Sequence, residues 1–280
     1  MPRKFFVCKE ETTWFSPAVR PADNQEIPIP SGWRPSDKMR KKKFLGASFV
    51  QRHVSNYFFL RIYHLTSLIP VPRKIREQNY QSNIVQLKNM HWDFWTLPSA
   101  YIENQNEWGN IMFGAGKHHN MRYSGCEIMA TFNALRALKG TGSPESMAEL
   151  IREYEAHGAA LRGEFGVSPK AIEAYLRKHG FWVTTTDKGD GESLEMVDRQ
   201  SQVLIAVVYN DANDITQQVH TICITKDAGT GYVLHNAYRQ DESGKYIAST
   251  PYATLSNAIS HISRYEAKLI YLIGIADSVL

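Results

Sequence analysis

The fold is decided by one stretch of the chain, residues 123–140, which reads YSGCEIMATFNALRALKG. Its apolar side chains recur at helical spacing, which predicts one helix with an apolar face. These side chains are Ile128, Phe132, Leu135 and Leu138. The helix is expected to begin at Cys126. It is expected to end before Gly140, because glycine readily supplies the left-handed residue that follows many helices.

In the residues that follow this stretch, the sequence pattern predicts further helices and then strands. A serine followed by proline can cap and open a helix, and this pair occurs at Ser143–Pro144 and at Ser168–Pro169. Beyond Gly180, β-branched runs and alternating patterns favour strands. The expected strands are 181–186, 203–209, 219–225, 232–238, 245–248 and 268–275, with a helix over 252–262. A helical half followed by an antiparallel sheet predicts an α+β fold.

Composition excludes several classes of protein. The chain has 280 residues, of which 43% are hydrophobic and 21% charged, which is too apolar for a wholly disordered protein. The sequence contains no run of about 18 apolar residues, so a membrane span is not expected. No apolar stretch of signal-peptide length follows the first residues. We therefore expect a cytoplasmic protein. The three cysteines, Cys8, Cys126 and Cys223, are too far apart to suggest a disulfide framework or a zinc cluster.

Charge divides the chain into a basic N-terminal part and an acidic remainder. Residues 1–90 hold 16 Lys and Arg against 6 Asp and Glu, a net charge of +10, and residues 91–280 hold 16 against 22, a net charge of −6. We interpret 1–90 as a basic N-terminal extension or accessory region, and 91–280 as the domain that carries the candidate site residues described below. The basic clusters 38–43 and 73–76 could bind an anionic partner. A solvated face, or docking on the acidic part, is the simpler alternative. Nucleic-acid binding is not expected, because no nucleic-acid motif accompanies the charge.

Cys126 is the candidate nucleophile. The N-terminus of a helix presents unpaired N–H groups and a partial positive charge, and both stabilise a thiolate. The thiolate is the form that attacks a carbonyl carbon, and a nearby imidazole would complete the pair. Most cysteines at the start of a helix are core residues, so Cys126 alone is weak evidence. Cys223 is expected to be a buried apolar residue.

His220 and Asn236 are the candidate base and its orienting residue. His220 lies in an alternating segment, on the same face as Ile222, and Asn236 follows sixteen residues later. A turn over 227–231 would join two antiparallel strands and bring the two residues onto neighbouring strands. The amide oxygen of Asn236 could then accept from the imidazole and fix its tautomer. His235 would face the other way if the strand is regular.

Asn120 stands six residues before Cys126. Its side-chain amide could donate to a developing oxyanion, together with the backbone N–H of Cys126. The alternative is a loop residue that caps a turn. The adjacent histidines His118 and His119 have no acidic or thiol partner at ligand spacing, so no metal site is expected.

Together these residues resemble the papain-like cysteine peptidases, and in detail the bacterial group related to double-glycine leader peptidases. That family places an amide six positions before a Cys that begins a helix, then a His on a strand and an Asp or Asn about sixteen residues later. The segment 166–183 is also similar to the family's helix leading into a strand. The resemblance covers roughly residues 105–275.

The resemblance implies hydrolysis of a peptide or isopeptide bond through a thioester, in a stand-alone enzyme with a peptide or protein substrate and no cofactor. Cys126 would attack, His220 would move the proton, Asn236 would orient His220, and Asn120 would bind the oxyanion. Amine transfer by an acyltransferase or transglutaminase on the same fold, or a non-catalytic peptide-binding module, are the alternatives. The sequence departs from the family at Asn120, where Gln is usual, and at Glu127, where Gly is common. The Glu127 carboxylate would oppose the thiolate unless it points to solvent or pairs with a base such as Arg122.

Overall fold

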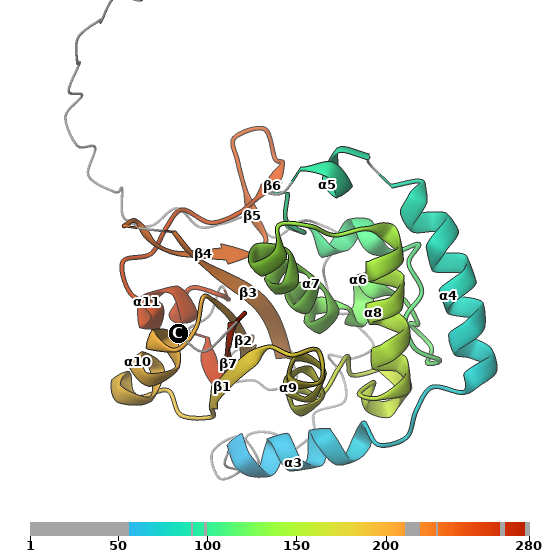
Figure 1. Ribbon diagram of the computed structural model, residues 1–280, viewed down its shortest axis with the longest axis horizontal. Coiled ribbons are helices and arrows are strands. Elements are labelled where there is room, and N and C mark those ends of the chain that lie inside the picture. The colour runs from blue at the N-terminus through green and yellow to red at the C-terminus, as the bar shows by residue number, and fades with distance from the viewer. Residues whose placement is uncertain are drawn as a thin grey trace, which may run out of the picture. The chain divides into compact units, whose positions relative to one another are not determined.

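The helices come first along the chain and most of the strands follow, as the sequence predicts (Figure 1). The computed structural model describes residues 56–90, 92–97, 100–210, 219–227, 229–263 and 267–277. The helices are α3 (Asn56–Thr66), α4 (Arg73–Lys88), α5 (Trp92–Thr96), η1 (Gln105–Trp108), α6 (Met121–Ser124), α7 (Cys126–Lys139), α8 (Pro144–Ala156), η2 (Ala160–Gly163), α9 (Pro169–Lys178), α10 (Gly191–Arg199) and α11 (Leu255–Ser260). The strands are β1 (Trp182–Thr186), β2 (Val203–Tyr209), β3 (Val219–Asp227), β4 (Gly231–His235), β5 (Arg239–Gln240), β6 (Tyr246–Ile247) and β7 (Lys268–Ala276). The predicted α+β class is confirmed at this level.

Five strands form one antiparallel sheet in the order β1-β7-β2-β3-β4. The central strand β2 is buried along its whole length, which explains why its sequence is a continuous apolar run instead of an alternating one. Its neighbour β3 pairs with it in register, with His220 opposite Val208 and Cys223 opposite Ile205. The sheet thus holds β3 rigidly at a position that the site uses.

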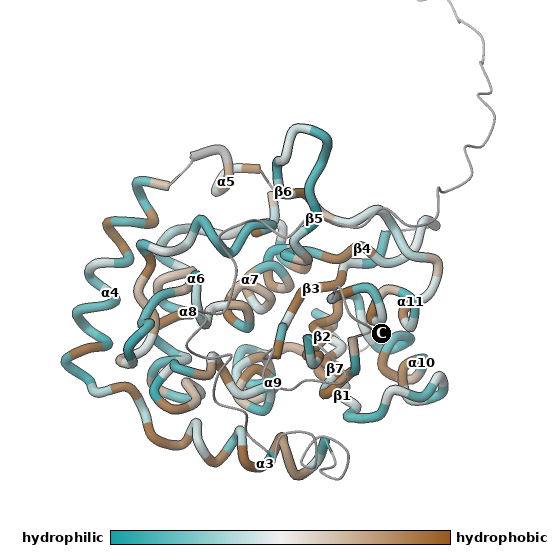
Figure 2. The backbone as a smooth tube through the Cα atoms, turned by 180° about the vertical axis from the view of Figure 1, so that it is seen from behind, coloured by the Kyte–Doolittle hydropathy of each residue, from teal (hydrophilic) through white to brown (hydrophobic). Residues whose placement is uncertain are grey.

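Helices cover both faces of this sheet, and a separate apolar core lies under each set (Figures 1 and 2). On one face, Ile205 and Cys223 pack under α7, α8 and α9. On the other face, Ile222 and Ile224 pack with α10 and α11. Alternate residues of β3 therefore face opposite cores, as the alternation of its sequence predicts.

Helix α7 is the buried helix of the larger core. It begins at Cys126 and ends before Gly140, whose φ of 67° is left-handed, so both predicted ends are confirmed. Gly125, which precedes Cys126, allows a close approach of the chain, because an added Cβ would lie 2.5 Å from the carbonyl oxygen of Met121. This close packing of α6 against the start of α7 fixes where the Cys126 side chain emerges.

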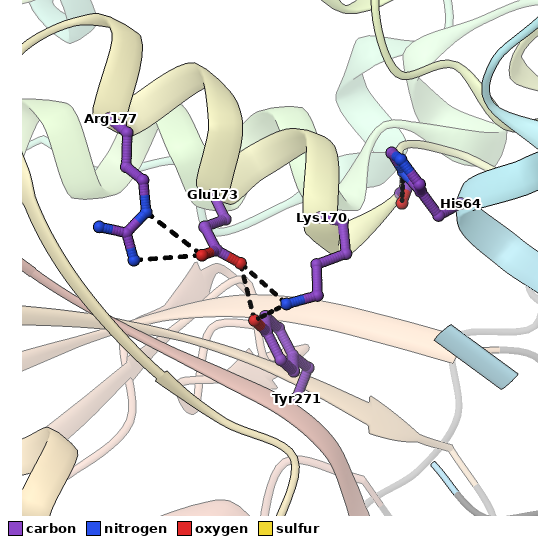
Figure 3. Close-up of polar contacts among 6 residues, drawn as sticks. His64, Lys170, Glu173, Arg177 and Tyr271 are labelled. Carbon is purple, nitrogen blue, oxygen red and sulfur yellow. Dashed lines mark hydrogen bonds and ion pairs between the residues drawn. The ribbon is translucent and has the colours of Figure 1, made fainter. Parts of the chain in front are cut away.

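Polar contacts attach α9 to the sheet (Figure 3). The hydroxyl of Tyr271 on β7 donates to Glu173 Oε2 at 2.8 Å, and Lys170 Nζ donates to the same oxygen at 3.0 Å. Arg177 donates to the other carboxylate oxygen of Glu173. A short contact of 3.5 Å between Ser168 and His64 also connects α9 with α3. These contacts hold α9 and α3 beside the start of α7.

The N-terminal part of the described chain packs on the larger core. Leu60 of α3, Val71 and Leu87 of α4 are buried in that core. The chain divides between Met1–Lys43 and Phe44–Leu280. Cys8 and the basic cluster 38–43 lie outside the described residues.

Helix α10 and strand β4 are among the elements that differ from the sequence prediction. Helix α10, capped by Asp190, lies in a segment that the sequence left unassigned. The predicted strand 232–238 ends at His235, because Asn236 and Tyr238 have φ values of 62° and 54°. These left-handed residues cannot continue a strand. Within the described residues, no helix is long and apolar enough to cross a bilayer.

Candidate active site

Cys126 lies at the first position of α7, against β3, with 8% of its surface exposed. The backbone N–H groups of Thr221 and Glu127 hydrogen-bond its sulfur. Thr221 follows His220 directly on β3, but no hydrogen bond among the described residues joins the sulfur to the His220 ring. Burial nevertheless raises the pKa of the thiol well above its ordinary value, and the nearby Glu127 carboxylate raises it further. The resting sulfur is therefore a neutral thiol.

His220 is 5% exposed, and its Nε2 contacts the backbone carbonyl oxygen of Asn236 at 3.0 Å. A carbonyl oxygen only accepts, so in the neutral ring Nε2 carries the proton and Nδ1 carries the lone pair. No hydrogen bond among the described residues engages Nδ1. Burial lowers the pKa of His220 to about 4, while the Asn236 carbonyl partly opposes this. The arrangement therefore presents a neutral imidazole with Nδ1 as its basic atom.

Asn236 does contact the base, but through its backbone and not through the side chain that the sequence suggested. Its side-chain Oδ1 accepts from the Gln105 N–H at 3.1 Å, and its Nδ2 donates to Gln105 Oε1 at 3.3 Å. The left-handed conformation of Asn236 ends the regular strand on which the side-chain prediction depended. The residue still fixes the tautomer of His220, as its carbonyl is the acceptor.

Two residues that sequence reasoning did not identify hold this segment in place. Glu103 accepts from the Asn236 N–H at 2.9 Å and contacts His235 Nδ1 at 2.6 Å. Gln105 donates from Nε2 to the carbonyl oxygens of Met121 and Arg122, at 3.2 and 3.1 Å. Gln105 thereby connects the Asn236 segment to α6, the turn that precedes Cys126. Neither residue stands in a motif, so no pattern in the sequence could have found it.

Tyr238 stacks on the candidate base. Its ring stacks on that of His220, with centroids 5.3 Å apart and planes 23° apart. Burial raises the pKa of Tyr238, and the charge of a Cys126 thiolate raises it further. A stacked ring restricts rotation of the imidazole. Tyr238 is therefore a positioning residue that sequence reasoning also missed, although it stands only two residues after Asn236.

Asn120 caps the short helix α6. Its side-chain Oδ1 accepts from the Tyr123 N–H at 3.0 Å, which is the turn-capping alternative stated above. No contact among the described residues joins Asn120 to Cys126. Its amide nitrogen is not engaged by a hydrogen bond among the described residues, so the cap leaves the group that would donate to an oxyanion available.

Glu127 is buried, which differs from the expectation of a solvent-facing or Arg122-paired carboxylate. It is 2% exposed, and the Tyr63 hydroxyl contacts its Oε1 at 3.4 Å, while Oε2 has no partner. The backbone of Gly166 encloses the carboxyl, since an added Cβ there would lie 2.4 Å from Oε2. Burial raises the pKa of Glu127 to about 7. The carboxyl is therefore partly protonated near neutrality.

Other cavities and clusters lie elsewhere in the described chain. A cavity of about 420 Å³ opens at the far end of α7, among residues that include Leu135, Lys139 and Phe181. No group of three or more His, Cys, Asp and Glu side chains among the described residues is arranged to hold a metal ion. Cys223 is fully buried, as expected. Comparison of the chain with protein-family models, curated proteins and solved structures gives no match.

Proposed function

We propose that this protein is a papain-like cysteine peptidase that cleaves a peptide or isopeptide bond through a thioester on Cys126. One observation carries the proposal. The sulfur accepts the N–H of Thr221, and the adjacent His220 has its Nε2 attached to a carbonyl, so that Nδ1 remains to take the thiol proton. A nucleophile at a helix N-terminus, a base beside it and a group that orients the base are the requirements of covalent acyl transfer.

In the proposed reaction, His220 Nδ1 removes the proton of the Cys126 thiol as the sulfur attacks the substrate carbonyl carbon. The backbone N–H of Cys126 and the side-chain amide of Asn120 donate to the oxyanion. The tetrahedral intermediate collapses, and the imidazolium returns the proton to the leaving amine. Water then hydrolyses the thioester with His220 acting again as base. These steps need no metal or organic cofactor.

The resting electrostatics favour attack coupled to proton transfer over a preformed ion pair. A thiolate–imidazolium pair requires the pKa of the thiol to lie below that of the imidazole. Here burial shifts the two pKa values in opposite directions, with the thiol raised and His220 lowered to about 4. The neutral pair therefore predominates until a substrate arrives, and His220 acts as a general base during the attack.

A non-catalytic peptide-binding module is the second candidate, because the thiol is nearly enclosed. Burial raises the pKa of Tyr63 on α3 well above its ordinary value, and the charges of Glu127 and of a Cys126 thiolate raise it further. A substrate would need more access to the sulfur than the 8% exposure of Cys126 provides. A binding module would instead keep α3 in place and use another surface.

Cleavage of a mixed peptide library by the full chain tests the proposal. Cys126→Ala should abolish every cleavage that the wild type performs, whereas Cys223→Ala, at the other buried cysteine, should retain them. Undiminished cleavage by the Cys126→Ala variant would overturn the assignment. A wild type that cleaves nothing, yet retains peptides, would favour the binding module.

A further inference from the structure

The outward face of α3 and the turn that follows it expose large apolar side chains. Six of them lie within thirteen residues, each between 46% and 61% exposed. They are Tyr57, Phe58, Ile62, Leu65, Leu68 and Ile69. We call this set the α3 surface. Figures 1 and 2 show α3 along the lower edge of the described unit, with many of its residues coloured as hydrophobic in Figure 2.

Helix α3 is apolar on two opposite sides. Leu60 and Tyr63 point inward and are 4% and 8% exposed. At 100° per residue, Phe58 and Leu65 lie roughly opposite to them. A helix that is apolar all round is normally buried all round. The inward side of α3 packs on the core of the protein, whereas Phe58 and Leu65 on the outward side are 53% and 61% exposed.

The apolar area extends beyond α3. Thirteen large apolar side chains are exposed among the described residues, and eight belong to the α3 surface or to its neighbours Leu161 and Phe165. The Tyr63 hydroxyl donates to the Phe165 carbonyl oxygen, so the two segments are adjacent. Scattered exposed apolar residues need no explanation, whereas a contiguous group marks an interaction surface.

The charge around this surface indicates its partner. From Asn56 to Arg76 the described chain contains four Lys and Arg residues and no Asp or Glu. Arg61 lies within the exposed face of α3, and Arg162 is exposed on the neighbouring η2. Apolar side chains that enter a bilayer surface, with cations beside them, match the acyl boundary and the headgroups of anionic lipids.

We propose that the α3 surface binds the face of an anionic membrane, with α3 lying in the interface. The helix has only 11 residues, far fewer than the roughly 20 that cross a bilayer, so it lies on the membrane and does not span it. Tyr57 and Phe58 supply aromatic rings of the kind that favour the headgroup level. An acidic protein partner would also meet the charge, and the test separates the two.

Vesicle sedimentation with the full chain tests the proposal. Vesicles of phosphatidylcholine with about one third phosphatidylserine are compared with vesicles of phosphatidylcholine alone, at roughly 0.1 M and 0.5 M salt. The double variant Phe58→Gln/Leu65→Gln removes two exposed apolar side chains of the surface. The matched control Met196→Gln/Ile247→Gln removes two exposed apolar side chains from α10 and β6, which lie elsewhere.

We expect the wild type and the control to sediment with the anionic vesicles, and to be released by high salt. The Phe58→Gln/Leu65→Gln variant should bind about tenfold more weakly or worse, because the apolar contribution is lost. No sedimentation of the wild type at low salt would overturn the proposal. Equal binding by the double variant would overturn it too, since charge alone would then suffice. A wild type that binds no vesicles but forms a dimer, when the double variant is a monomer, would also overturn the proposal.

Discussion

Replacing Glu127 by Gln should remove a pH-dependent loss of stability. The carboxyl is enclosed, and burial raises its pKa from 4.5 to about 7. An acid with a raised folded pKa stabilises the protein most below pH 4.5, and this contribution is lost as the pH rises through 7. A shift of this size corresponds to roughly 3 kcal/mol in total, of which about 2 kcal/mol is lost between pH 5.5 and pH 8. Gln cannot ionise, so the variant should lack this loss.

The same substitution should also make Cys126 more reactive. The Glu127 carboxylate raises the pKa of the thiol, so its removal should lower that pKa and increase alkylation by iodoacetamide at pH 8 severalfold. Gln keeps a side-chain oxygen that can accept from the Tyr63 hydroxyl, so the local fold should persist. Unfolding in urea at pH 5.5 and pH 8 measures the first effect. Labelling of Cys126 followed by mass spectrometry measures the second.

Glu155 provides a matched control for this experiment. Burial also raises its pKa to about 7, and its Oε1 accepts from Asn79 and from the Gly114 N–H. Glu155→Gln should therefore lose a similar pH dependence of stability and leave the labelling of Cys126 unchanged. The reasoning is refuted if Glu127→Gln keeps the wild-type pH dependence, or if both variants change Cys126 labelling equally.

Three further predictions concern the residues around the thiol. Tyr63→Phe removes the hydroxyl that contacts Phe165 and Glu127, so the free energy of unfolding in urea should fall by about 1 kcal/mol. Alkylation of Cys126 should become faster in this variant, and slower alkylation would contradict this role. Gly125→Ala forces a Cβ to within 2.5 Å of a carbonyl oxygen and should destabilise by about 1–3 kcal/mol in the same assay, and an unchanged midpoint would show that the turn relaxes freely. Burial lowers the folded pKa of His220 from 6.5 to about 4. The free energy of unfolding of the wild type should therefore fall by up to roughly 3 kcal/mol as the pH drops from 6.5 to 4. His220→Gln should lack this dependence, and an identical acid profile in the two proteins would refute the assignment.

Local sequence patterns predicted the elements whose formation depends on neighbouring residues. The apolar spacing and Gly140 predicted α7 at both ends, and the β-branched run of β2 identified a buried strand. Such patterns arise from burial and backbone preference, which act over a few residues. The fold class followed from their order. The division of the chain near residue 43 could not be predicted from these patterns, because the packing of Leu60 on the core is a long-range contact.

The sequence named candidate residues for the site but not their geometry. The sequence singled out Cys126 and His220, yet it could not show that Asn236 would adopt a left-handed conformation and present its carbonyl instead of its amide. The burial of Glu127 and the bonds between Gln105 and Asn236 depend on segments more than thirty residues away in sequence. Such contacts leave no periodic trace in a single sequence.

The alkylation rate of Cys126 as a function of pH tests the pairing of sulfur and imidazole most directly. It should be measured in the wild type, in His220→Ala and in His235→Ala, since His235 is an equally buried histidine bound to Glu103. The account predicts that His220→Ala slows alkylation near neutral pH by at least tenfold, whereas His235→Ala retains the wild-type pH profile unless it unfolds, which circular dichroism would show. A folded His220→Ala protein whose Cys126 reacts at the wild-type rate would contradict the account.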